Sequence, residues 1–251
     1  MERKIAVITG GSRGIGKAIA LRLAEAGVDP IITYKSSDKE AAEVVRQITA
    51  SGGRSAALPL DVSDRNSYLN FAAPVQGVLK QWRRERFDFL VNNAGIGHSQ
   101  PFAETPEDVF DMMMNIHFKS VFFLSQGLLP LMNDGGEIIN VSTGTTRFAL
   151  PGYSIYAALK TAVEGLTKYM AKELGPRGIR VNVVAPGATE TDFRGGAIRN
   201  NPQMKKMLEA NTALGRVGQA EDIAGVVCAL LSRDCYWING QRVEASGGQG
   251  L

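Results

Sequence analysis

The chain has 251 residues, of which 44% are hydrophobic and 21% charged, and its formal net charge is +3. This length and composition suit one α/β domain, exclude a disordered chain and give no reason to expect nucleic acid or a membrane as partner. The two cysteines, Cys228 and Cys235, cannot form a disulfide framework, and their spacing is not that of a zinc site. No apolar run approaches the ~18 residues of a membrane span. We therefore expect one cytoplasmic domain over residues 1–251 that holds no metal.

Short β-type runs alternate with helical stretches along the chain. In the first half, the pattern predicts strands at Ile5–Thr9, Ile31–Tyr34, Ala56–Leu60 and Phe89–Val91, and helices at Lys17–Ala26, Lys39–Ser51, Tyr68–Arg86 and Thr105–Met132. In the second half, it predicts strands at Gly136–Val141, Arg180–Val184 and Gly240–Ala245, and helices at Ser154–Leu174, Pro202–Ala210 and Ala220–Leu231. Residues 187–218 are otherwise irregular.

Strands separated by helices of about ten residues need right-handed crossovers, which give a parallel sheet covered on both faces. The alternation therefore predicts a single-domain, doubly wound Rossmann-type α/β fold with a mostly parallel seven-stranded sheet. Ligands of such folds bind beyond the carboxyl ends of the strands, so the residues that follow strands are the first candidates for a site.

A glycine-rich turn, Thr9–Gly16, lies between the first expected strand and the following helix. A strict G-x-G-x-x-G pattern fails because Ile19 stands at the third position, and an ordinary tight turn is the alternative. The place between strand and helix nevertheless suits a pyrophosphate, which binds backbone N–H groups that a Cβ atom would obstruct. The candidate binding residues are Gly10, Ser12, Arg13, Gly14, Ile15 and Gly16.

The residues after the second expected strand bear on the choice of cofactor. An acidic residue at this point holds a ribose 2′-hydroxyl, whereas a 2′-phosphate needs a cation. Here Lys35 and Ser36 follow Tyr34, and Arg13 can approach from the glycine-rich turn. Asp38 comes later and is expected to cap the next helix. The sequence thus favours NADP(H) over NAD(H).

Tyr156 and Lys160 lie four residues apart in an expected helix, so both side chains share one face. A tyrosine with a pKa near 10 becomes an effective base when a nearby cation favours its phenolate. Tyr153, the nearest alternative, has Ala157 at the corresponding position and therefore no cationic partner. The pair is a candidate for proton transfer to or from a carbonyl or alcohol oxygen.

Four motifs together resemble those of the classical short-chain dehydrogenases/reductases, in the same order and at matching intervals over essentially the whole chain. They are Thr9-Gly10-x-x-x-Gly14-x-Gly16, Asn92-Asn93-Ala94-Gly95, Tyr156-Ala-Ala-Leu-Lys160 and Pro186-Gly187. The resemblance implies that Tyr156 is the general acid/base. It also implies that Lys160 lowers the pKa of Tyr156 and holds the nicotinamide ribose.

The same resemblance implies a hydroxyl that orients the substrate carbonyl at the end of the fifth strand. An ungapped count from Tyr156 favours Thr143 over Ser142, and neighbours on a strand point to opposite faces, so one of the two is expected to serve. Asn115 matches the family asparagine that helps to hold a water beside the lysine. His117, two residues further on, should point elsewhere on an ideal helix.

Further cofactor contacts follow from the resemblance: Asp61 and Val62 at the adenine, and Thr189 and Thr191 at the carboxamide and phosphates. Asp61 could instead cap the next helix. Residues 188–218 are expected to form a lid over the substrate, and the chain is expected to form a homotetramer or homodimer. The remaining expected cofactor residues are Asn93, Ala94, Gly95, Tyr156, Lys160, Pro186 and Gly187.

These features predict an NADP(H)-dependent oxidoreductase that interconverts a carbonyl and an alcohol of a small molecule. Similarity to 3-oxoacyl-carrier-protein reductases raises the possibility of a 3-oxoacyl thioester substrate. The segment Leu128–Asp134, however, holds no cation to receive an acidic carrier protein. The alternative is an NADP(H)-binding sensor or scaffold protein without turnover.

Overall fold

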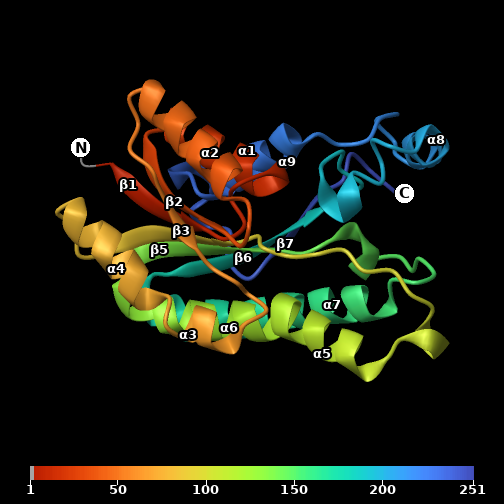
Figure 1. The fold of residues 1–251 in the computed structure, drawn as a ribbon, viewed down its shortest axis with the longest axis horizontal. Coiled ribbons are helices and arrows are strands. Elements are labelled where there is room, and N and C mark those ends of the chain that lie inside the picture. The colour runs from red at the N-terminus through yellow and green to blue at the C-terminus, as the bar shows by residue number, and fades with distance from the viewer. Residues whose placement is uncertain (1–2) are drawn as a thin grey trace.

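A computed structural model describes residues 3–251 as seven strands in one parallel sheet between two layers of helices (Figure 1). The strand order, β3-β2-β1-β4-β5-β6-β7, reverses between β1 and β4 as in a doubly wound fold. The expected Rossmann-type architecture is confirmed, with every strand pairing parallel. The strands are β1 (Lys4–Ile8), β2 (Val28–Tyr34), β3 (Ala56–Pro59), β4 (Phe87–Asn92), β5 (Met132–Val141), β6 (Arg180–Pro186) and β7 (Arg242–Ala245).

The helices cover the sheet in two groups (Figure 1). One face carries α1 (Gly14–Glu25), α2 (Asp38–Ala50) and α9 (Ala220–Leu230). The other face carries α3 (Arg65–Leu69), α4 (Ala72–Gln81), α5 (Glu107–Met114), α6 (Ser120–Leu128) and α7 (Ser154–Leu174). Helix α8 (Pro202–Ala210) lies to one side, within the irregular segment that precedes α9. None of the helices within residues 3–251 is both long and apolar enough to cross a membrane.

Strand alternation divides the core between the two faces of the sheet. In β1, Ala6 and Ile8 pack in the cluster beneath α1, α2 and α9, whereas Ile5 and Val7 pack in the cluster on the opposite face. A strand buried on both faces reads as a continuous apolar run, which is why the β1 sequence is apolar throughout. The carboxyl ends of the central strands are thereby held at one edge by apolar burial.

The single helix expected at Thr105–Met132 is wrong. Helix α5 begins after Pro106, a π-helical turn covers Asn115–Lys119, and α6 continues from Ser120. The helical segment ends in a 3₁₀ turn at Leu129–Leu131, because Pro130 lacks the N–H that an α-helix needs. Strand β5 therefore starts at Met132, four residues before the expected boundary.

The expected helix at Tyr68–Arg86 is also divided, into α3 and α4, and it ends at Gln81. Arg83 has a φ of 57°, a left-handed conformation that no helix continues through. Asp38 is the first residue of α2 and not its cap, since Ser37 occupies that position without a side-chain bond. Asp64, which the sequence did not single out, caps α3 through the Asn66 N–H.

Candidate active site

The first two motifs meet at the carboxyl ends of β1 and β4. The Asn93 amide donates to the Thr9 carbonyl at 2.9 Å and to the Gly10 carbonyl at 3.1 Å. In return, the Thr9 hydroxyl accepts from the backbone N–H groups of Asn93 and Ala94, both at 2.9 Å. The loop after β4 thus holds the glycine-rich turn in shape through four hydrogen bonds.

The amino end of α1 has the features that a phosphate-binding site needs. Arg13 occupies the N-cap position and makes no side-chain cap bond, so no side chain of its own competes for the first N–H groups. Gly14 has a φ of 54°, and a Cβ atom at Gly16 would collide with the Gly10 carbonyl oxygen. The glycines therefore fit a turn that presents backbone donors to a pyrophosphate. Ser12 is buried, and Ile15 packs on the core below.

Lys35 stands at the end of β2, where the expected 2′-phosphate contact lies, and Ser36 beside it is exposed. The Lys35 Nζ lies 2.8 Å from Asp61 and 3.2 Å from the Ser63 hydroxyl. Partial burial raises the pKa of Asp61, but hydrogen bonds from Lys35 and Ser63 outweigh it and bring that pKa below its usual value. The cation and the expected adenine residue therefore form one cluster, and Val62 packs against the core beside it.

Tyr156 and Lys160 are both buried on the inner face of α7. Burial raises the pKa of Tyr156, and a hydrogen bond with the Thr143 hydroxyl opposes this rise. The Lys160 Nζ donates to the Val141 carbonyl at 2.7 Å, and burial lowers the pKa of Lys160 to about 8. The expected lowering of the Tyr156 pKa by Lys160 is not found, since the Nζ is bonded to β5 and lies 6.0 Å from the centre of the phenol ring.

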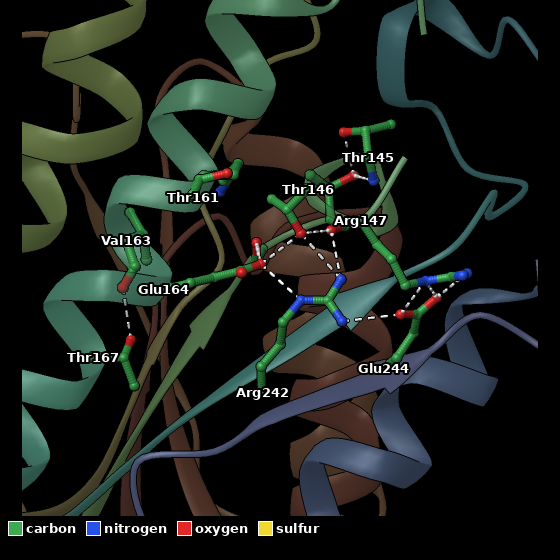
Figure 2. Close-up of polar contacts among 12 residues, drawn as sticks. Thr145, Thr146, Arg147, Thr161, Val163, Glu164, Thr167, Arg242 and Glu244 are labelled. Atoms are coloured by element: carbon green, nitrogen blue, oxygen red, sulfur yellow. Dashed lines mark hydrogen bonds and ion pairs between the residues drawn. The ribbon is translucent and has the colours of Figure 1, made fainter. Parts of the chain in front are cut away.

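Thr143 and Ser142 face different partners. The Ser142 hydroxyl donates to Glu164 at 2.6 Å, while the Thr143 hydroxyl contacts Tyr156 and lies 3.2 Å from the Thr145 hydroxyl. Figure 2 shows Glu164 on α7 facing Arg242 on β7. Arg242 donates to Glu164 at 2.9 Å and to the Thr143 carbonyl at 3.2 Å.

This ionic cluster extends to the end of the chain (Figure 2). Glu244 accepts from Arg242 at 2.9 Å and from Arg147 at 2.9 Å. Arg147 also donates to the backbone carbonyls of Gln249 and Gly250. No sequence pattern predicts this cluster, because Arg147, Glu164 and the Arg242–Glu244 pair are far apart in the chain and each alone is typical of a solvated surface.

The segment after β6 returns to the glycine-rich turn. Pro186 ends the strand, and Gly187 donates its N–H to the Ala245 carbonyl at 3.1 Å. Thr189 donates to the Gly187 carbonyl at 3.0 Å. Thr191 lies opposite Gly14, 3.5 Å from where a Cβ atom of that glycine would stand. The structure thus brings the expected residues after β6 beside those after β1.

The α5–α6 region departs from expectation. Asn115 begins the π-helical turn, and its side chain makes no hydrogen bond to any residue in the range 3–251. His117, which was expected to point elsewhere, is buried and meets the Tyr156 ring edge-on at 5.1 Å between centres. A π-helical turn holds more residues than an α-helical one, so side-chain directions after Met114 differ from those of an ideal helix.

A buried amide ladder behind the site was likewise not anticipated. The Asn92 amide donates to Asn140 at 2.8 Å and to Ser125 at 3.0 Å, and the Asn140 amide donates to Thr167 at 2.9 Å. These bonds link β4, β5, α6 and α7, and they satisfy polar groups that would be costly to bury alone. The ladder fixes α7, and with it Tyr156, against the sheet.

Comparison with known proteins places this geometry in a family. A family model described as Enoyl-(Acyl carrier protein) reductase matches residues 10–249. The chain is 38% identical over 248 residues to an uncharacterized oxidoreductase of Methylorubrum extorquens, covering 99% of this chain and 98% of that protein. It is 35% identical to a hydroxynaphthalene reductase-like protein, Arp2, of Metarhizium brunneum, covering 98% and 94% of the two chains.

Among solved structures, the angucycline C-6 ketoreductase LanV with bound NADP superposes with a TM-score of 0.93 at 37% identity, covering 98% of this chain and 95% of that one. The sequence resemblance, the sheet order and these matches agree over nearly the full length. The chain belongs to the short-chain dehydrogenase/reductase family of oxidoreductases.

Proposed function

We propose that this protein is an NADP(H)-dependent reductase that interconverts a ketone and an alcohol. The observation that carries the proposal is the buried phenol of Tyr156, which contacts the Thr143 hydroxyl. Tyr156 lies one helical turn before the buried Lys160 on α7. A protonated phenol beside a second hydroxyl can donate a proton to a carbonyl oxygen that a hydride is converting to an alkoxide.

The glycine-rich turn and the free start of α1 fit the pyrophosphate of a dinucleotide, and Lys35 with Arg13 fits a 2′-phosphate. The NADP bound to LanV supports the same cofactor here. When bound, the reduced nicotinamide supplies the hydride. Asn93, Ala94 and Gly95 would line the nicotinamide end of the site, together with the residues after β6.

In the direction of reduction, Tyr156 donates its hydroxyl proton to the substrate oxygen, and Thr143 donates a hydrogen bond to the same oxygen. The raised pKa of Tyr156 keeps the phenol protonated at neutral pH, which suits it as an acid. Lys160 is protonated below its pKa of about 8 and is the nearest cation for the phenolate that remains. Asn115 stays a prediction of the family resemblance.

Aromatic rings around the phenol favour a planar ketone as substrate. Tyr153 and Phe193 have ring centres 6.4 Å and 6.3 Å from that of Tyr156. Phe193 and Arg194 belong to the proposed lid at residues 188–218, and the Arg194 guanidinium contacts the Tyr153 hydroxyl. LanV and Arp2 carry the names of enzymes for polycyclic or naphthalene substrates, which supports this class over a 3-oxoacyl thioester.

The proposal is tested by following NADPH absorbance with bicyclic aromatic ketones, aliphatic ketones and a 3-oxoacyl thioester. We expect turnover of the bicyclic ketones and a loss of at least about 100-fold in kcat for Tyr156→Phe, the usual size of a general-acid contribution. NADPH binding without turnover of any carbonyl would favour the sensor or scaffold alternative. Undiminished turnover by Tyr156→Phe would contradict the role of the phenol.

Exposed aromatic side chains also support a homotetramer or homodimer. Phe122 and Phe123 on α6 meet edge-to-face, with ring centres 5.1 Å apart, and both are exposed in the single chain. Apolar side chains grouped in this way commonly mark protein interfaces. Sedimentation equilibrium of the purified protein measures the oligomeric state directly, and a monomer at micromolar concentration would contradict the proposal.

A further inference from the structure

His117 is a buried titratable group that the proposed reaction leaves without a task. Its side chain lies in the π-helical turn between α5 and α6, and the residue is only 1% exposed. The ring meets Tyr156 edge-on, and the charge of Lys160 acts on it. A histidine that contacts the Tyr156 ring and feels the charge of Lys160 calls for an account of its own chemistry.

The hydrogen bonding of the ring fixes its protonation state. The Nε2 atom lies 2.9 Å from the Ile96 carbonyl oxygen, which can only accept, so Nε2 carries the proton. Burial, reinforced by the charge of Lys160, lowers the pKa of His117 to about 3, so the imidazole is neutral at physiological pH. Nδ1 is therefore an unprotonated acceptor.

That acceptor has no partner in residues 3–251. Among the buried side-chain nitrogen and oxygen atoms of these residues, Nδ1 of His117 is the one that makes no hydrogen bond. It faces the loop after β4, where a Cβ atom at Gly95 would stand 3.3 Å away. An unsatisfied buried acceptor costs about 1–3 kcal/mol, so we expect a donor from outside the protein chain, a water or a substrate group, to pair with Nδ1.

We propose that His117 is a positioning residue for carbonyl reduction, whose neutral imidazole supports the Tyr156 ring and offers Nδ1 to the proton path that begins at Lys160. The histidine then occupies the place that the family resemblance assigns to an asparagine, and Asn115 lies outside the path. His117 stays neutral in this scheme. Its Nδ1 accepts a hydrogen bond, and its Nε2 keeps its proton and donates to the Ile96 carbonyl. The inference rests on the proposed function.

Two substitutions separate this role from simple packing. His117→Phe keeps a flat ring beside Tyr156 but removes both nitrogens, whereas His117→Gln keeps a donor for Ile96 and an acceptor. Met113 packs in the same apolar cluster as Tyr156, so Met113→Leu is the matched control for a small change in packing. The readouts are kcat and KM for a ketone, the dissociation constant of NADPH and the pH profile of kcat from pH 6 to 10.

We expect His117→Phe to lower kcat about tenfold or more, the size expected for one buried hydrogen bond, with the dissociation constant of NADPH unchanged. Its basic limb should move to lower pH, because a phenyl ring stabilises the buried ammonium of Lys160 less than an imidazole does. His117→Gln should recover kcat to within a few-fold, and Met113→Leu should match the wild type. A folded His117→Phe enzyme with wild-type kcat, or equal losses in the Phe and Gln variants, would overturn the proposal.

A measurement that needs no turnover keeps this test independent of the proposed function. The chain has two histidines, so ¹⁵N NMR of the imidazoles is simple, and His98→Gln assigns the signals. We expect His117 to remain in the Nε2–H form from pH 5 to pH 9. A titration of His117 within that range, or a proton on Nδ1, would overturn the inference even if ketone reduction is confirmed.

Discussion

Thr143 and Ser142 are adjacent residues with comparable hydroxyls, and their surroundings separate them. Glu164 accepts from Ser142 at 2.6 Å, which leaves that hydroxyl committed to the ionic cluster. The Thr143 carbonyl accepts from Arg242, and its hydroxyl contacts both Thr145 and Tyr156. The alternation of a strand predicts that one of the two serves, but only the contacts identify the partners of each.

Replacement of the two hydroxyls should therefore have unequal effects. We expect Thr143→Ala to lower kcat by about 100-fold, since removing one donor to a developing oxyanion costs that much or more. Ser142→Ala should lower the free energy of unfolding through the loss of its bond to Glu164 and change kcat much less. Steady-state kinetics and urea denaturation of both variants check this, and equal losses of kcat would contradict it.

Lys160 gives the reaction a basic limb. Its pKa is lowered from 10.5 to about 8, so its ammonium is lost as the pH rises through 8. We expect kcat for reduction to fall above pH 8. The folded state releases this proton at a lower pH than the unfolded chain does. As the pH rises from 8 to 10.5, this group alone therefore increases the free energy of unfolding. Activity lost with the melting temperature maintained would support this assignment, and a flat kcat up to pH 10 would refute it.

Lys35 should decide the choice between the two nicotinamide cofactors. Lys35→Asp replaces the cation at the end of β2 and places a carboxylate beside Asp61, with which Lys35 is now paired at 2.8 Å. We expect kcat/KM to shift toward NADH, because a 2′-phosphate then meets like charge. Lys39→Asp, on the same exposed stretch, is the control for a change in net charge. An unchanged ratio for the two cofactors would exclude the role of Lys35.

At the scale of elements, apolar periodicity located the strands and most helices, because β1, β2, β4 and β6 are almost wholly buried and most helices bury one face. The divided α5–α6 segment could not be anticipated, since a π-helical turn leaves no pattern in apolar spacing. This explains why Asn115 was favoured and His117 passed over. The placement of His117 between apolar Ile116 and Phe118 was the available signal.

A buried ion pair joins β5 and β6 at Glu137 and Arg180, the first residues of the two strands to pair with each other. Arg180 bonds to Glu137, which also accepts from Asn182 at 3.0 Å, and both members of the pair are buried. We expect Glu137→Ala to reduce the free energy of unfolding by about 3–5 kcal/mol, because it leaves the guanidinium buried without its counter-ion. Since the pair lies at the other end of the paired segment from Val141, which accepts from Lys160, kcat of the folded fraction should persist. Guanidinium chloride denaturation measures the loss, and a cost below 1 kcal/mol would contradict it.

For the whole molecule, the alternation of strands and helices was enough to predict where residues distant in sequence would meet. The turns after β1, β4 and β6 come together as the parallel sheet requires, so Thr9, Asn93 and Thr191 lie in one region. Side-chain partners could not be predicted, because the cluster of Arg147, Glu164, Arg242 and Glu244 depends on how three separate segments pack. No apolar or glycine pattern encodes such a meeting.

The last residues of the chain form a brace for the loop after β6. The Gln249 side chain accepts from the Ala188 N–H at 2.7 Å. Arg147 donates to the backbone carbonyls of Gln249 and Gly250. A protein shortened by residues 246–251 would lose this brace without losing any strand. Proteolysis at this end would then weaken cofactor binding and leave the circular dichroism spectrum unchanged. Preparations stored for different times would therefore differ in cofactor affinity before they differ in secondary structure.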